Sequence, residues 1–586
     1  MTALKRDGVS RPRRGDRLPA PVALLAALAL GTSVAPVPRV AVADEPAVAD
    51  AAAGQADLDA AVDAKLGIGS LDDFEKVLEL VRSALRKGLD DNSRKFANDL
   101  YTGTLVDRAA MITDALFSGG EAARQWERLR AYALRDLGEA LQRDDGLAVG
   151  HVMIARLESL PGGDRKRAVA AANRAVELGG DDPLQTAQAR IVLGNLADDA
   201  AERRAQYDKA VELAPRDVEI RRTRGMFLMT EGDVDGALAD IDVAIEEEPD
   251  DVRLREMRGL ALLVGKRTDE AKATFDAALE LAPDSADVLF QRGRLLASLG
   301  DRDRALADLD KAIGLVPDAA EALVLRARLH QMGGDGDAAR ADVERVLGRQ
   351  PEHAAALEMR GLLAADRGDY AAAIGDFRRL ARQQPDDAVL VSQLALLYLA
   401  DKQPREAIRR FSRALEIDPS LFVARRGRSD AEISVGDHAA AIADLEKAVE
   451  AEPEDEGVLN NLAWLLATSP EDSIRDGKRA VELATKACEL SEWKKPHIVS
   501  TLAAAHAESG DFEQAKVFSR RAVEGAEEED DVRSQLRSEL ASYEAGKPWR
   551  ERQTIDDGDA PAPEAGPARP VPAPPRPNGT RRPFDD

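Results

Sequence analysis

The sequence predicts an all-α fold, a right-handed superhelical solenoid built from stacked helical hairpins. Three observations predict this fold. Residues 218–455 divide into seven consecutive blocks of 34 residues without an insertion, small residues recur at the eighth and twentieth places of the blocks, and proline recurs at the thirty-second place. One hairpin cannot bury its own apolar face, so a fixed period of this length is typical of repeats that stack on one another.

Each block is predicted to form two short amphipathic helices. Apolar residues fall at i, i+3, i+4 and i+7 within each half, which is the spacing of one helix face. A turn such as Gly232-Asp233 separates the halves, with glycine as a left-handed stop and aspartate as the cap of the next helix. A proline such as Pro249 then ends the second helix. The blocks begin at Val218, Val252, Ala286, Ala320, Ala354, Ala388 and Phe422.

This pattern resembles the tetratricopeptide repeat (TPR) family. In the first block the resemblance is carried by Gly225 at place 8, Ala237 at place 20, Ile241 at place 24, Ala244 at place 27 and Pro249 at place 32. The other six blocks repeat the pattern with similar residue types. The resemblance implies the solenoid fold, but it leaves the partner open because this scaffold holds many unrelated partners.

The first 43 residues are predicted to be a signal peptide. The leading segment is net positive, an apolar core follows from Val22 to Leu30, and the triplet Ala41-Val42-Ala43 predicts cleavage after Ala43. The core is too short to span a bilayer comfortably. We therefore expect an exported protein of the periplasm or cell envelope that is not inserted in a membrane after cleavage. The alternatives are an uncleaved anchor and a disordered cytoplasmic leader.

The regions on either side of the regular blocks follow the same period less strictly. Before them, Val77, Val81 and Ala84 have the spacing of places 20, 24 and 27, which predicts degenerate repeats. After them, the carboxyl-terminal part of the chain, through Gly546–Glu551, resembles the ends of predicted exported bacterial TPR proteins without an assigned activity. The predicted segments are a flexible linker over 44–55, degenerate TPR-like helical repeats over 56–217, two further repeats over 456–530, the first with a long turn, a capping helix and end segment over 531–552, and a disordered Pro-rich tail over 553–586.

A pattern of opposite charges recurs inside the blocks. Place 7 is arginine in six blocks, and in five of these place 23 of the same block is aspartate. Pairing with the preceding block instead would set Arg428 against Arg410. We infer ion pairs within each repeat, with solvated surface charges as the alternative. The predicted pairs are Arg224–Asp240, Arg292–Asp308, Arg326–Asp342, Arg360–Asp376 and Arg428–Asp444.

Composition and motifs exclude several classes of function. A formal net charge of −26 and a pI near 4.9 disfavour nucleic acid as a partner. Cys488 is the single cysteine, so no intramolecular disulfide can form, and we expect it in the core. The six histidines are scattered, and no phosphate-binding loop or dinucleotide fingerprint is present. The sequence therefore indicates no catalytic residue, no cofactor and no metal site.

The remaining candidate is a binding surface, which the TPR resemblance supplies. Ligands of the family usually lie along an inner groove lined by places 2, 5, 9, 12 and 13 of the first helix. Carried over by register, the groove residues are Met226, Met229, Leu260, Leu263, Val264, Phe290, Arg294, Arg328 and Met332. The alternative is that these side chains pack against neighbouring repeats.

The predicted function is a non-enzymatic scaffold that binds protein or peptide. The alternatives are a structural component of an envelope assembly, for which self-association is possible, and a regulatory subunit of an enzyme complex.

Overall fold

The computed structural model describes residues 51–117, 126–179, 182–526 and 531–551. The predicted signal peptide and the predicted Pro-rich tail lie outside these ranges. The described residues form 27 α-helices and no β-strand. None of the described helices has both the length and the apolar character needed to cross a membrane.

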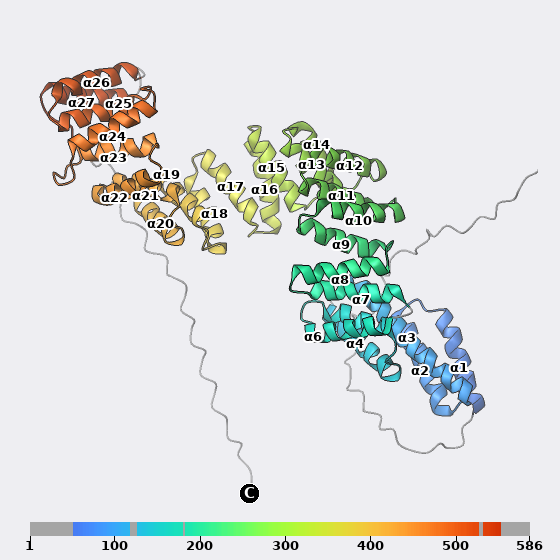
Figure 1. Ribbon diagram of the computed structural model, residues 1–586. Helices are drawn as coiled ribbons and strands as arrows, with labels where there is room; N and C mark the ends of the chain where they lie inside the picture. The colour runs from blue at the N-terminus through green and yellow to red at the C-terminus, as the bar shows by residue number, and fades with distance from the viewer. Residues whose placement is uncertain (1–50, 118–125, 180–181, 527–530, 552–586) are drawn as a thin grey trace, which may run out of the picture. The chain divides into compact units, whose positions relative to one another are not determined.

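The chain divides into two compact units, residues 1–295 and 296–586. In the first unit successive helices lie against one another as hairpins (Figure 1). Its helices are α1 (Ala51–Leu66), α2 (Leu71–Lys87), α3 (Asp91–Phe117), α4 (Trp126–Arg143), α5 (Ala148–Glu158), α6 (Arg165–Leu178), α7 (Pro183–Leu196), α8 (Ala200–Leu213), α9 (Val218–Thr230), α10 (Val234–Glu247), α11 (Val252–Val264), α12 (Thr268–Leu281) and α13 (Ala286–Ser298), whose last turn enters the second unit.

The second unit continues the same arrangement of paired helices. Its helices are α14 (Arg302–Leu315), α15 (Ala320–Met332), α16 (Gly336–Arg349), α17 (Ala354–Asp366), α18 (Tyr370–Gln383), α19 (Ala388–Ala400), α20 (Pro404–Ile417), α21 (Phe422–Val435), α22 (His438–Ala451), α23 (Glu456–Thr468), α24 (Gly477–Leu490), α25 (Pro496–Glu508), α26 (Phe512–Gly525) and α27 (Asp531–Glu544).

The helices of residues 218–451 follow the 34-residue period. The first helices, α9, α11, α13, α15, α17, α19 and α21, begin at the seven residues that open the blocks. The turn prediction is confirmed: Gly232 has φ 77°, and the Asp233 side chain accepts a hydrogen bond from the N–H of Gly236 at the start of α10. Two turns place a lysine where the others have glycine, Lys266 with φ 57° and Lys402 with φ 59°.

The small and large residues of the period meet in the core of each hairpin. Ala237, Ile241 and Ala244 on α10 are fully buried. On α11, a Cβ added at Gly259 would lie 2.3 Å from the ring of Phe275, the aromatic residue at place 24, so a larger side chain at Gly259 would collide with this ring. This close contact explains why place 8 is small throughout the blocks.

The amino-terminal helices correct one prediction. Residues 51–55, assigned to a flexible linker over 44–55, lie in the first turns of α1. Alanine has the highest helix propensity, and Leu58 and Ala61 anchor the helix in a core formed with α2 and α3. Further along, the buried Arg108 donates two hydrogen bonds to Asp136, at 2.7 and 3.0 Å, and so ties α3 to α4.

The carboxyl-terminal helices differ from the regular hairpins in one turn. Residues 469–476 join α23 to α24, and Arg475 at their end contacts Glu508 on α25 at 2.8 Å. The core here contains Leu462, Leu466 and Tyr543, the last from α27. These contacts make α27 part of the stacked array.

Candidate partner-binding surface

The surface that the TPR register indicates is the first-helix face, which we define as places 2, 5, 9, 12 and 13 of the first helices. On α9, Met226 is 56% exposed, although Phe227 and Leu228 beside it are buried. On α11, Val264 is 49% exposed, and Leu260 and Leu263 are half-buried. These positions recur every three or four residues, so the core and the exposed face lie on opposite sides of each helix.

The predicted residues of the first unit form an apolar strip with a charged end. We call Met226, Met229, Leu260, Leu263 and Val264 the α9–α11 strip. Met229 lies partly buried against the core, and α9 neighbours α11. On α13, the Phe290 ring is half-buried, with the guanidinium of the exposed Arg294 5.9 Å from its centroid.

The two remaining predicted residues lie on α15 in the second unit. Arg328 is exposed, and Met332 is 76% exposed at the end of the helix. The α9–α11 strip and these two residues belong to different units, so each set is described within its own unit.

Sequence reasoning missed a second set of exposed apolar residues on the same face. Leu362 on α17 and Leu396 on α19 occupy place 9, and Val389 on α19 and Val423 on α21 occupy place 2. All four are more than a third exposed. The register used for the first two blocks would have found them, because it predicts exposure at these places in every block.

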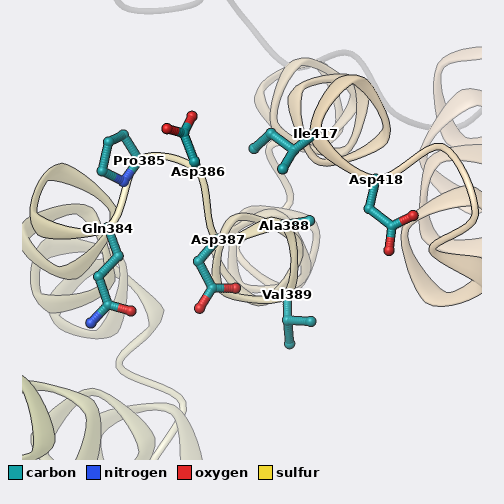
Figure 2. A pocket seen from close by; sticks show the side chains of 8 residues that line it. All are labelled: Gln384, Pro385, Asp386, Asp387, Ala388, Val389, Ile417 and Asp418. Carbon is teal, nitrogen blue, oxygen red and sulfur yellow. The ribbon is translucent and has the colours of Figure 1, made fainter. Parts of the chain in front are cut away.

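A cleft of about 590 Å³ lies at the edge of this second set. Its lining comes from the loop before α19, the start of α19 and the end of α20, and it joins apolar side chains to three aspartates (Figure 2). Asp387 caps α19 by accepting from the N–H of Leu390 at 3.0 Å, and Asp386 accepts from Arg413 at 3.1 Å. The lining residues are Gln384, Pro385, Asp386, Asp387, Ala388, Val389, Ile417 and Asp418.

The structure brings four of the five predicted ion pairs together within their repeats. Arg224 donates from Nε and Nη2 to both carboxylate oxygens of Asp240, each at 2.7 Å. The same two-point contact joins Arg326 to Asp342, Arg360 to Asp376 and Arg428 to Asp444. Of the fifth pair, Arg292 lies in the first unit and Asp308 in the second. Within its own unit, Arg292 donates to Asp276 at 2.8 Å.

These arginines also reach the preceding repeat, which sequence reasoning missed. The second partner lies 16 residues before each arginine, so that one guanidinium joins two repeats. The partners of Arg224, Arg258, Arg292, Arg326, Arg360 and Arg428 are Asp208, Asp242, Asp276, Asp310, Glu344 and Ser412. A planar guanidinium has enough donors in a fixed arrangement to hold both partners at once. The contacts therefore fix the register between neighbouring hairpins.

The single cysteine lies in the core. Cys488 is fully buried, its Sγ lies 3.7 Å from the carbonyl oxygen of Ile498, and burial raises the pKa of its thiol to about 11. Among the described residues, no three His, Cys, Asp or Glu side chains gather in a way that could hold a metal ion.

Comparison with known families identifies the repeats. Models of the tetratricopeptide repeat match residues 222–286, 290–341, 325–388, 364–422 and 428–455. Residues 222–455 are tetratricopeptide repeats. TPR segments generally mediate protein–protein contacts and are generally non-catalytic scaffolds. The comparison with curated proteins finds no matching sequence.

Several solved TPR structures are similar to parts of the chain. A TPR protein from Parabacteroides merdae ATCC 43184 is 20% identical, with 42% of this chain and 97% of that chain covered and a TM-score of 0.32. YrrB, a TPR protein with an unusual peptide-binding site, is 22% identical, with 32% and 95% covered and a TM-score of 0.30. PilW, a type IV pilus biogenesis factor, is 18% identical, with 35% and 96% covered and a TM-score of 0.32. Because these TM-scores are low, the likenesses carry no conclusion about what this chain binds.

Proposed function

We propose that this protein is a non-enzymatic scaffold of the cell envelope that binds an extended protein or peptide segment along the first-helix face. The α9–α11 strip carries the proposal, because it exposes apolar side chains in register on two neighbouring helices. Isolated exposed apolar residues are common on proteins, but contiguous ones often mark a partner site. Met226 and Met229 add flexible thioether side chains, which adapt to partners of different shape.

Charged residues border the strip. Arg222 at place 5 of α9 pairs with Glu219 at 2.6 Å, and Arg253 at place 2 of α11 pairs with Asp251 at 3.2 Å. An apolar centre with a polar rim is the usual composition of a protein interface. The helices hold this surface in place before the partner arrives, which lowers the ordering cost of binding an extended segment.

The envelope location in this proposal rests on the leader sequence. Export followed by cleavage after Ala43 predicts that the protein isolated from its native host begins at Asp44. Mass spectrometry of its amino-terminal peptide tests this expectation. A chain that retains Met1 would contradict the cleaved, exported form.

The binding role is tested by affinity capture from the envelope fraction of the native host, with residues 44–586 as bait. A variant with Met226→Glu and Val264→Glu changes the two most exposed side chains of the strip and leaves the half-buried ones in the core. The matched control carries Leu281→Glu and Leu315→Glu, which are exposed 48% and 42% at the ends of second helices. We expect a partner that the control retains and the strip variant loses. Equal recovery on both variants, with helicity unchanged, would overturn the proposal.

A further inference from the structure

The end segment, which we define as residues 547–551, follows α27 and returns to α23. The N–H of Glu551 donates to the carbonyl oxygen of Thr468 at 2.9 Å, and the carboxylate of Glu551 accepts from Nε1 of Trp464. Trp549 packs against the core formed by α23, α25 and their neighbours. The contacts join residues more than 80 positions apart in the sequence.

Arg550 makes the charged contact of the end segment. Its Nη1 donates to the carbonyl oxygen of Ala467 at 3.4 Å, and its Nη2 lies 2.7 Å from Oε2 of Glu508 on α25. Glu508 is also held by Arg475 at 2.8 Å. The Glu508 carboxylate is thus contacted by two arginines, Arg475 from the turn before α24 and Arg550 from the end segment, and both help to neutralise its charge.

The contacted residues belong to the first-helix face. Counted from Glu456, the residues Trp464, Ala467 and Thr468 occupy places 9, 12 and 13. Met226, Met229 and Val264 occupy the same places in the first two regular blocks. The end segment therefore lies where the TPR register places a bound peptide.

A proline in the turn after α23 removes the hydrogen bond that the carbonyl oxygen of Ala467 would accept in a regular turn. In the regular turns the N–H at place 15 bonds to the carbonyl oxygen at place 12, as from Gly232 to Met229 at 3.2 Å and from Gly368 to Ala365 at 2.9 Å. In the block of α23, place 15 is Pro470, which has no N–H. The last carbonyls of a helix need partners from outside it, and here the end segment supplies them.

We propose that the carboxyl-terminal end of α23, together with Glu508 of α25, is a specific site for an extended peptide in which an aromatic residue, an arginine and a carboxylate follow one another. The end segment is its built-in occupant, and a partner segment of the same chemistry displaces it. The arginine pairs with Glu508 and the Ala467 carbonyl, the carboxylate accepts from Trp464, and a backbone N–H donates to Thr468. The inference rests on the proposed binding role of the first-helix face and assigns one ligand chemistry to one part of it.

The test uses the full mature chain with Trp549→Ala and Arg550→Ala, which removes two of the three side chains that hold the end segment in the site and so favours its release; we call this variant the emptied chain. The probe is a fluorescein-labelled peptide with the sequence of residues 546–552, and the control peptide replaces its tryptophan and arginine with alanine. Because a tethered segment competes at high effective concentration, we expect the emptied chain to bind the probe at least tenfold more tightly than the unaltered chain. Adding Trp464→Phe, which removes the indole N–H and part of the ring but keeps an aromatic side chain, is expected to weaken binding severalfold.

Either of two binding results would overturn the inference: an emptied chain of unchanged helicity that does not bind the probe, or equal binding of both peptides. Hydrogen exchange on the unaltered chain gives an independent measurement, because excess unlabelled probe should speed exchange at residues 547–551. Unchanged exchange there at probe concentrations that saturate the emptied chain would also overturn it. Dimers of the unaltered chain that the two substitutions abolish would assign the site to a second copy instead.

The outcome is distinguishable from failure of the binding role as a whole. If partner capture depends on Met226 and Val264 but the emptied site binds no probe, the proposed function stands and this inference fails. If capture is indifferent to Met226 and Val264, the proposed function fails, whatever the probe does.

Discussion

Replacement of Glu432 by glutamine is expected to stabilise the protein at neutral and alkaline pH but not at acidic pH. Glu432 lies on α21, its side chain is 8% exposed, and among the described residues its Oε2 has no hydrogen-bond partner. Burial raises the pKa of this carboxyl to about 7, with further contributions from the charges of Asp444 and Asp437 and an opposing one from Arg428. The ordinary value is 4.5.

The sign follows from proton binding. Between pH 4.5 and 7 the folded chain keeps the proton on Glu432, whereas the unfolded chain releases it, so ionisation in the unfolded state lowers stability as pH rises. A shift from 4.5 to about 7 corresponds to about 3.5 kcal/mol at most, at roughly 1.4 kcal/mol for each pKa unit. Glutamine does not titrate and avoids this loss. The advantage of Glu432→Gln should therefore be small below pH 4.5 and reach its maximum near pH 8.

Urea unfolding followed by far-UV circular dichroism at pH 4.5 and pH 8 measures the effect. The exposed Glu416 of α20 provides the matched control, and Glu416→Gln should give nearly the same difference at both pH values. An advantage of Glu432→Gln that is equal at pH 4.5 and pH 8 would refute the reasoning, because it would not come from protonation.

Three further predictions concern the repeats and the core. Asp342→Ala should lower the free energy of unfolding by about 2 kcal/mol, because Asp342 is the buried partner of Arg326. Asp310→Ala should lower it by less than about 0.5 kcal/mol, because Asp310, the other partner, is 61% exposed. Equal losses for the two variants in urea unfolding would contradict the bridging model. Lys402→Gly should raise stability by about 0.5–1 kcal/mol, because the lysine sits at φ 59°, and a lower thermal midpoint would argue against strain there. Cys488 should not react with a thiol reagent in the native chain at pH 8 and should react fully in urea; rapid native reaction would show that its helix opens.

The sequence predicted the helical hairpins because residues only a few positions apart determine them. Gly232 and Asp233 form a turn by local conformational preference, and the small residue at place 8 follows from packing inside one hairpin. The start of α1 was misplaced because alanine-rich sequence is compatible with both linker and helix until Leu58 and Ala61 reach their core.

The missed features of the surface depend on contacts between distant residues. The intra-repeat partner of Arg360 lies at place 23, where aspartate recurs opposite the arginine of the same block. Its second partner, Glu344, lies at place 25 of the preceding block, where the residue type varies and the pairing cannot be found from one block. The return of the end segment to Trp464 spans 87 residues and has no periodic signal. Within the repeat pattern, Pro470 is the residue that indicates this contact. Its effect can be interpreted only when the hydrogen bonds of the other turns are known.

Site-specific photocrosslinking tests the central claim most directly, that the first-helix face binds an extended segment. A photoreactive residue at position 226, in the α9–α11 strip, is compared with one at position 281, which is similarly exposed but lies on a second helix. In the envelope of the native host, we predict that position 226 crosslinks to a protein partner through one short stretch of its sequence, and that position 281 does not. Crosslinks from position 281 alone, or identical patterns from both positions, would contradict the account.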